Sequence, residues 1–275
     1  MPAIFTSRSQ RDSNLGCESD RPWSDLQWGL CFWDDVIEFA GPQAWHLRDF
    51  YLPRLAQALT HPEPPVRQAA FYGVGMAAQH GCPEWDTVLP EFTLTLIKCI
   101  GALNSRDSQN NFSTENAICA VTKIMKYRPH CLPSSLGGLD QLIPNWLTWL
   151  PVWEDTSETY GVFDYLCDLV QANCPALLGP DNANLPRVVH AIAHCLASKG
   201  MSPEGPQESH GMAVSTADHQ QTDAVGSDGK SDDPASPDSR HPARAYFRCL
   251  HILRQVQASC INLSEFLHCI ALNKP

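Results

Sequence analysis

The sequence lacks the features that would place it in several common functional classes. No stretch approaches the roughly 18 to 20 apolar residues that a membrane span needs. The first 22 residues hold only a three-residue apolar patch, too short for the core of a secretory signal. Basic residues are scarce, with 19 against 30 acidic ones, so the net charge is −11 and binding to nucleic-acid phosphates is disfavoured. We expect neither membrane insertion nor nucleic-acid binding.

The 12 cysteines do not form the pattern of a disulfide scaffold. They are scattered singly, without any Cys-x-x-Cys pair, in a chain of 275 residues that is long enough to bury a sizeable core. Such spacing is typical of free thiols in a reducing compartment.

Patterns for catalysis or metal binding are weak. His190 and His194 lie four residues apart, so a helix would turn both imidazoles to one side, near Cys195. The residues between them lack the Glu of a His-Glu-x-x-His motif, and no third ligand is identifiable. Adjacent acids such as Asp34 and Asp35 would point about 100° apart on a helix, not at one shared centre. We expect no catalytic residue, no metal site and no cofactor.

An apolar period of three to four residues runs through most of residues 24–200, whereas the alternation typical of strands is hard to find. The pattern predicts an all-α fold. Capping boxes are indicated at two places just before such runs, where a polar residue is followed three positions later by Gln or Glu. These pairs are Ser24 with Gln27, and Asp155 with Glu158. The predicted helices are 24–40, 43–60, 65–80, 84–103, 113–128, 139–150, 157–178, 184–199 and 243–258.

Alternate helices begin at a nearly constant spacing. Asp25, Arg67, Glu115 and Glu158 fall in their first turns, at successive separations of 42, 48 and 43 residues. HEAT and armadillo repeats are helical hairpins of roughly 40 to 47 residues. The spacing therefore predicts an α-solenoid of about four to five hairpins, each with one inner and one outer helix.

The predicted helix 65–80 carries small residues where a buried face is expected. Ala70, Gly73 and Ala77 recur at helical spacing. A glycine inside a helix costs about 1 kcal/mol relative to alanine, a loss that close packing of neighbouring helices offsets. We therefore predict that this helix lies unusually close to its neighbours in the stack.

Residues 200–240 interrupt the helical pattern. They contain eight acidic and two basic residues among abundant Ser, Pro and Gly, which is typical of disorder. When these 41 residues are left out, Arg244 lies 45 positions after Glu158, so the repeat period is restored. The predicted organisation is a disordered leader (1–21), HEAT repeats (22–199), a disordered acidic Ser/Pro-rich insertion (200–240) and final HEAT helices (241–275).

Six unusual strings follow one another along the chain: "QWGLCFWDDVIEF", "VRQAAFYGVGMAAQHG", "TENAICAVTKIMKYRPHC", "NWLTWLPVWED", "FDYLCDLVQANCPALLGPDNANLPRV" and "LRQVQAS". Together they resemble the C-terminal HEAT repeats of the karyopherin-beta (importin-beta) family of nuclear transport receptors. The match runs from about Trp23 to Ala197 and resumes near Leu253. The resemblance implies a right-handed HEAT-repeat α-solenoid whose inner helices line a concave surface.

The resemblance also implies partners. Family members accept cargo proteins with basic localisation signals on acidic concave patches, and the negative charge of this chain is compatible with that mode. Ran GTPase is a further expected partner, although this chain would lack the N-terminal repeats that supply the family's principal Ran-binding surface. A location in cytoplasm and nucleus, and no enzymatic activity, are implied as well. The candidate partner-binding residues are Asp34, Asp35, Glu38, Arg67, Gln68, Glu115, Asn116, Lys123, Glu158 and Asp164.

Several interpretations stay open at this point. Arg67 is as well suited to a polar ladder between repeats as to a partner, and the other candidates also suit an ordinary solvated helix face. The leading hypothesis is a fragment of a nuclear import receptor. The alternatives are a cytoplasmic HEAT scaffold without a transport cycle and an inactive truncated fragment, and the chain could be an isoform, a paralogue or a piece of a longer protein.

Overall fold

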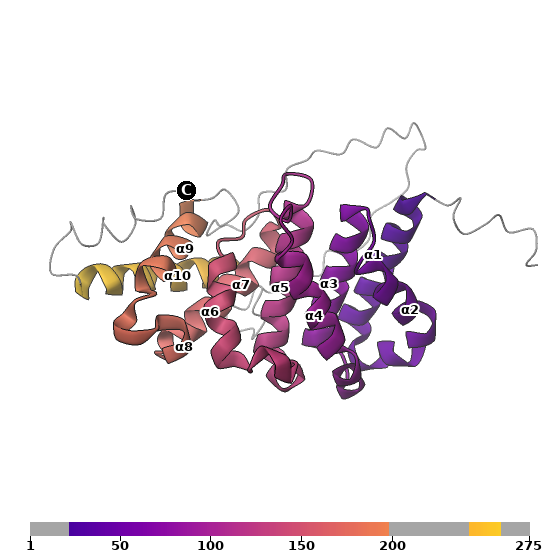
Figure 1. The fold of residues 1–275 in the computed structure, drawn as a ribbon, viewed down its shortest axis with the longest axis horizontal. Coiled ribbons are helices and arrows are strands. Elements are labelled where there is room, and N and C mark those ends of the chain that lie inside the picture. The colour runs from indigo at the N-terminus through magenta and orange to yellow at the C-terminus, as the bar shows by residue number, and fades with distance from the viewer. Residues whose placement is uncertain (1–21, 198–241, 260–275) are drawn as a thin grey trace, which may run out of the picture. The chain divides into compact units, whose positions relative to one another are not determined.

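The computed structural model describes residues 22–197 and 242–259 (Figure 1). Within these two ranges all regular elements are helical and no strand occurs, which confirms the predicted all-α fold. None of the described helices is both long and apolar enough to cross a membrane. The expected leader 1–21 and the insertion 200–240 lie outside the described residues. The chain divides into two compact units, Met1–Trp149 and Leu150–Pro275.

Unit 1 consists of stacked helical hairpins. Its elements are α1 (Trp23–Ala40), η3 (Gly41–Leu47), α2 (Arg48–Ala58), α3 (Pro64–His80), η4 (Pro83–Thr87), α4 (Leu89–Ile100), α5 (Asn111–Tyr127), η5 (Pro129–Cys131), η6 (Ser134–Leu136) and α6 (Leu139–Trp149). Helix α3 packs between α1 and α5, and the three run side by side (Figure 1). Helices α2, α4 and α6 each contact the preceding member of this row, so the hairpins are α1–α2, α3–α4 and α5–α6.

Unit 2 is also built from helices packed against one another. Its elements are α7 (Thr156–Gln171), α8 (Pro175–Leu178), η7 (Pro180–Asn182), α9 (Leu185–Ala197) and α10 (Pro242–Ser259). Helix α10 packs against α7 and also touches α9. This pairing agrees with the restored repeat period, which places α10 one period after α7.

Most helix ends lie close to the predicted ones, but three predicted helices are divided. The predicted helices 43–60 and 84–103 each open with a 3-10 segment, η3 and η4, so α2 and α4 begin only at Arg48 and Leu89. The helix expected at 157–178 ends at Gln171, and Asn173 adopts a left-handed φ of 48° before Pro175 opens α8. Proline has no N–H to continue the hydrogen-bond ladder, and its ring restricts the preceding residue, so the chain turns here.

The two capping predictions have different outcomes. Asp155 caps α7, because its Oδ1 accepts hydrogen bonds from the backbone N–H groups of Ser157 and Glu158 at 3.2 and 3.3 Å. The predicted Ser24–Gln27 box is wrong. Helix α1 begins one residue before Ser24, with Pro22 at the N-cap position and no side-chain capping bond, so Ser24 already lies inside the first turn.

The small residues of α3 allow the close packing that the sequence predicts. Ala70, Gly73 and Ala77 are all buried. On the side of α5, a Cβ placed on Gly75 would lie 3.4 Å from the Cα of Ala120, so the two helix backbones approach each other closely. Larger side chains at these positions would force the helices apart.

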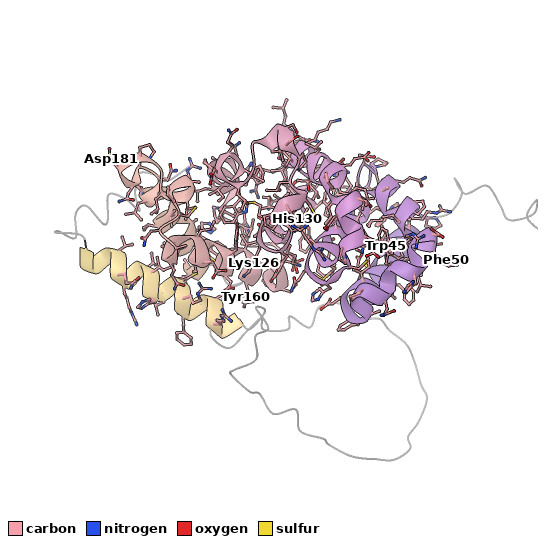
Figure 2. The ribbon with its side chains drawn as sticks, turned by 90° about the horizontal axis from the view of Figure 1, so that it is seen from below. Trp45, Phe50, Lys126, His130, Tyr160 and Asp181 are labelled. Atoms are coloured by element: carbon pink, nitrogen blue, oxygen red, sulfur yellow. The ribbon has the colours of Figure 1, made fainter. Side chains whose placement is uncertain are left out.

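In unit 1 an aromatic cluster packs η4 against η3 and α2. Trp85 and Tyr51 are fully buried, with ring centroids 5.9 Å apart, and Trp45 packs on Trp85 at 5.3 Å. Trp45 and the exposed Phe50 lie at the α1–α2 end of the unit (Figure 2). Burying each large aromatic side chain contributes about 1.5–3 kcal/mol, so the cluster anchors η4 firmly.

Candidate protein-binding surface

The structure separates the ten candidate partner-binding residues by exposure. Five side chains are buried: Asp34, Glu115, Asn116, Glu158 and Asp164. Glu38, Arg67, Gln68 and Lys123 are half-buried, and Asp35 is exposed. In this conformation only the half-buried and exposed residues offer side-chain surface to a partner.

Two of the accessible candidates are joined by a residue that sequence reasoning missed. The Tyr72 hydroxyl donates to Oε2 of Glu38 at 3.4 Å, and Nζ of Lys123 lies 5.2 Å from the centroid of the Tyr72 ring. The Lys123 stem crosses α3 at Gly75, where an added Cβ would lie 3.1 Å from Lys123 Cδ. Tyr72 therefore connects α1, α3 and α5. Its position four residues after Gln68, on the same helix face, was the available sequence signal.

One flank of α1 combines acidic and aromatic side chains. Trp28, Phe32 and Phe39 are 73%, 59% and 80% exposed. At 100° per residue they share one side of the helix with Asp35, and Glu38 lies at the edge of the same arc. We call these five residues the α1 surface. Its chemistry suits a segment that carries both positive charge and apolar groups.

Arg67 contacts the following repeat. Its guanidinium donates to the carbonyl oxygens of His61 and Pro62, both at 2.7 Å, and to Oδ1 of Asn110 at 2.8 Å. Asn110 lies 43 residues later, at the start of α5. The geometry therefore gives Arg67 the role of a rung in a polar ladder between repeats, which was one of its two expected roles.

Arg106 forms the next contact of this ladder and pairs with the buried acid Glu115. Its Nη1 lies 3.2 Å from Oε1 of Glu115, which is 1% exposed, and it also donates to Oδ1 of Asn111 at 3.0 Å. Asn111 in turn donates to the same Glu115 oxygen at 3.3 Å. Arg106 also donates to the carbonyl of Trp149, 43 residues away. A buried carboxylate needs such partners, because an unpaired charge would be costly to desolvate.

Arg248 plays the corresponding role in unit 2. It donates to the carboxylates of Asp164 and Asp168, the latter at 2.8 Å, and to Gln171 at 2.7 Å. Arg248 lies 84 residues after Asp164, a separation that falls to 43 once the 41 residues 200–240 are left out. Arg106 and Arg248 were not among the sequence candidates, but complementary residue types one repeat apart are a pattern that could have identified them.

Asp34 has an unusual electrostatic environment. It is 3% exposed, and among the described residues its Oδ1 has no hydrogen-bond partner. Burial, followed by the negative charge of Asp35, raises the pKa of the Asp34 carboxyl well above its ordinary value. Because the charged form is disfavoured there, Asp34 is poorly suited to bind a cationic partner directly.

The histidine pair considered for metal binding takes part in packing. The His190 and His194 ring centroids lie 6.3 Å apart, and His194 packs on Trp153 at 5.2 Å. Burial, followed by the neighbouring His194, lowers the pKa of His190. Among the described residues, neither histidine belongs to a group of three or more close metal donors.

Stacked helical hairpins, joined by arginine ladders with a period near 43 residues, define an α-solenoid of HEAT repeats. A comparison with solved structures confirms this class. The fold is similar to that of the karyopherin Kap121p bound to the SUMO protease Ulp1p, with a TM-score of 0.57 and 23% identity over 67% of this chain and 16% of that chain.

Sequence comparisons point to the same group of proteins. The chain is 26% identical over 168 residues to importin subunit beta-3 of Saccharomyces cerevisiae (strain ATCC 204508 / S288c), a match that covers 61% of this chain and 15% of the relative. It is 28% identical over 183 residues to the probable importin-5 homolog of Dictyostelium discoideum, covering 65% and 16%. No family model matches the sequence. The resemblance to karyopherin-beta proteins is confirmed, and the chain spans about a sixth of the length of these relatives.

Proposed function

We propose that this chain is an importin-beta-like binding module that engages basic segments of cargo proteins in nucleocytoplasmic protein import. The observation that carries the proposal is the similarity to two importins over more than 60% of the chain. The HEAT-repeat fold supports it, because stacked repeats present extended surfaces for protein partners. On this proposal the chain acts without catalysis and is present in both cytoplasm and nucleus.

The proposed contact region consists of the α1 surface together with Tyr72 of α3 and Lys123 of α5, which lie next to Glu38. Asp35 and Glu38 supply negative charge beside exposed aromatic rings, and Tyr72 extends the region toward α3 and α5. A lysine- or arginine-rich segment could pair with the carboxylates and stack on the rings. The buried acids Glu115 and Asp164 act in this proposal as supports of the repeat stack.

Fluorescence anisotropy with a labelled Lys/Arg-rich localisation-signal peptide tests the proposal. We expect the full chain to bind this peptide and to ignore a version in which the basic residues are replaced by alanine. Asp35→Asn and Glu38→Gln should each weaken binding about 2- to 5-fold, because exposed ion pairs contribute roughly 0.2–1 kcal/mol. Circular dichroism should show unchanged helicity in both variants.

Glu91→Gln is the matched control. Glu91 is an exposed acid on α4, a helix outside the α1–α3–α5 row, so its neutralisation changes net charge equally without touching the proposed region. Equal losses in all three variants would show that the peptide senses only overall charge. No binding by a well-folded sample would overturn the proposal.

A cytoplasmic HEAT scaffold remains the alternative function, since the same fold serves unrelated roles. The two functions differ in their response to Ran. A transport module should release the basic peptide when Ran loaded with GTP is added, and should not do so with Ran loaded with GDP. Release by neither form, together with peptide binding, would favour the scaffold. A chain that fails to melt cooperatively would favour the inactive fragment.

A further inference from the structure

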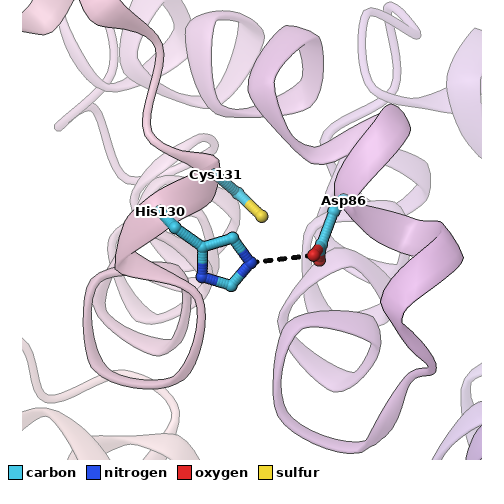
Figure 3. Close-up of side chains that lie close together, drawn as sticks. All are labelled: Asp86, His130 and Cys131. Atoms are coloured by element: carbon cyan, nitrogen blue, oxygen red, sulfur yellow. Dashed lines mark hydrogen bonds and ion pairs between the residues drawn. The ribbon is translucent and has the colours of Figure 1, made fainter.

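Two connecting segments of successive repeats bring three metal-binding side chains together. Asp86 lies on η4, and His130 and Cys131 lie on η5. One carboxylate oxygen, one imidazole nitrogen and the thiol sulfur all lie within 4.8 Å of one another. Figure 3 shows the three side chains converging, with Nε2 of His130 2.8 Å from Oδ2 of Asp86.

The local structure holds these donors in place. Pro83 and Pro129 open the two short helices and fix their first φ angles. Trp85, beside Asp86, is fully buried in the aromatic cluster. Arg128 links the two segments, since it donates to Oδ1 of Asp86 at 3.1 Å, to the carbonyl of Ala78 at 3.2 Å and to the carbonyl of Gly81. The donors therefore come from well-anchored backbone.

The exposure of the three groups is graded. Cys131 is 3% exposed, the Asp86 side chain is 29% exposed, and the His130 side chain is 62% exposed. An ion could thus enter from the histidine side and meet a sheltered sulfur. Sulfur, imidazole nitrogen and carboxylate oxygen are together the ligand set that zinc prefers.

We propose that Asp86, His130 and Cys131 form a binding site for zinc or a similar divalent transition metal, joining two successive repeats. The ion would take the thiolate sulfur, Nε2 of His130 and Oδ2 of Asp86, and water would complete a tetrahedral set. Arg128 holds the other carboxylate oxygen and so orients Asp86, as outer-shell partners of metal ligands do. This site is separate from the α1 surface and does not depend on the proposed transport function.

Metal binding would displace the protons that Cys131 and His130 now direct toward the other donor groups. Burial, followed by a hydrogen bond to Asp86, raises the pKa of the Cys131 thiol to about 12, so the thiol carries its proton at neutral pH. Forming the metal–sulfur bond breaks the S–H bond, and the proton passes to solvent. The His130 proton shifts to Nδ1, which leaves the Nε2 lone pair for the metal.

The rival arrangement is a hydrogen-bonded cluster without metal. Asp86 already accepts hydrogen bonds from Arg128 and His130, and the positive charge of Arg128 opposes a second cation. Hydrogen bonds from His130 and Cys131 and the charge of Arg128 outweigh burial and lower the pKa of Asp86. A cluster of this kind would stabilise the contact between repeats but would take up no ion.

Cobalt(II) titration of the full chain separates the two arrangements, because cobalt bound to thiolate in a tetrahedral site gives strong near-ultraviolet and visible absorption. We expect about one equivalent to bind with a thiolate absorption band, and zinc to displace it. Cys131→Ser should abolish the band. His130→Gln should weaken uptake at least 10-fold, and because His130 is largely exposed, this variant should fold normally.

Cys99→Ser is the matched control for the other thiols. Cys99 is a half-buried cysteine of α4 whose sulfur contacts the carbonyl of Leu59 at 3.9 Å. Its variant should keep the full cobalt signal. A folded wild-type chain without a thiolate band, or a band that survives Cys131→Ser, would overturn the proposed site.

Discussion

Gly73 of α3 and Asp34 of α1 are in close contact. A Cβ added to Gly73 would lie 2.2 Å from Oδ1 of Asp34 and 3.4 Å from Cδ1 of Leu55, too close to the carboxylate for any side chain to fit without movement. Asp34 is buried and has little room to turn away. At this position glycine is therefore required by packing between repeats.

We expect Gly73→Ala to lower the free energy of unfolding by about 1–3 kcal/mol, because overpacking outweighs the better helix propensity of alanine. Gly29→Ala is the control, since Gly29 is an exposed glycine of α1 with nothing within 4 Å of an added Cβ. That variant should gain about 0.5–1 kcal/mol. Urea unfolding measures both, and equal effects of the two substitutions would contradict the proposed contact.

The raised pKa of Asp34 predicts how the free energy of unfolding changes with pH. A carboxyl whose folded pKa lies above its unfolded value binds more protons in the folded state, so its stabilising contribution is present at low pH and is lost as pH rises through the folded pKa. Asp34→Asn should therefore match the wild type near pH 4 and exceed it near pH 7.5. The gain should be about 1–3 kcal/mol, the usual cost of an unsatisfied buried polar group.

Urea unfolding at both pH values measures this difference. Glu91→Gln serves as the comparison, because Glu91 is an exposed acid of α4 that does not contribute to the raised pKa of Asp34. A stability gain by Asp34→Asn that is the same at both pH values would show that lost charge is not its cause.

At the scale of single helices, arginine side chains determine how elements of different repeats are joined. Helix α10 follows α9 only after a long intervening segment, yet it packs on α7 through Arg248, whose side chain is 16% exposed. Buried Cys249 and Ile252 of α10 add apolar contact to the same unit. The ionic contact with Asp164 and Asp168 then selects the register of α10 against α7.

We expect Arg248→Ala to loosen α10 selectively. Hydrogen bonds to charged groups contribute about 1.5–3 kcal/mol, and the variant would also leave the buried Asp164 carboxylate without its main cation. Hydrogen–deuterium exchange should rise in α10 and in the facing part of α7, with little change in unit 1. Arg254→Ala, at an exposed position of the same helix, should leave exchange unchanged. An equal rise in both variants would contradict the anchoring role.

At the scale of the whole molecule, the negative charge is unevenly distributed. Residues 200–240 carry eight acidic and two basic residues. Their net charge of −6 is more than half of the chain's net charge of −11. Attraction of a basic peptide could therefore come from this segment or from the helical repeats. Long-range attraction of this kind speeds association and is screened by salt over about 10 Å at 0.1 M ionic strength.

A chain without residues 200–240 distinguishes the two sources. If the α1 surface binds the peptide, the variant should keep its affinity within about 3-fold at 0.15 M salt, while the association rate should fall and become less sensitive to salt. Stopped-flow fluorescence and anisotropy measure the two quantities. A loss of affinity that equals the effect of removing the basic residues from the peptide would assign binding to the acidic segment instead.

Much of the fold was predictable because helices and repeats depend on local and periodic patterns. The predicted helix 65–80 and the observed α3 differ by one residue at the start, and Asp155 caps α7 as its spacing indicates. The break after Gln171 was missed, because the apolar pattern continues across it while Pro175 ends the helix. Ser24 was misread as a cap because short polar motifs also occur inside first turns.

The sequence by itself determined the all-α class, the repeat period, the small face of α3 and the acidic balance, since each is a property of residue order and type. Only the tertiary structure decided that Asp34 and Glu115 are buried while Asp35 faces solvent. The tertiary structure alone also brought Asp86 together with His130 and Cys131, 44 and 45 positions away. The physical reason is that burial and pairing depend on side chains from the next repeat, whose distance and orientation are set by helix packing.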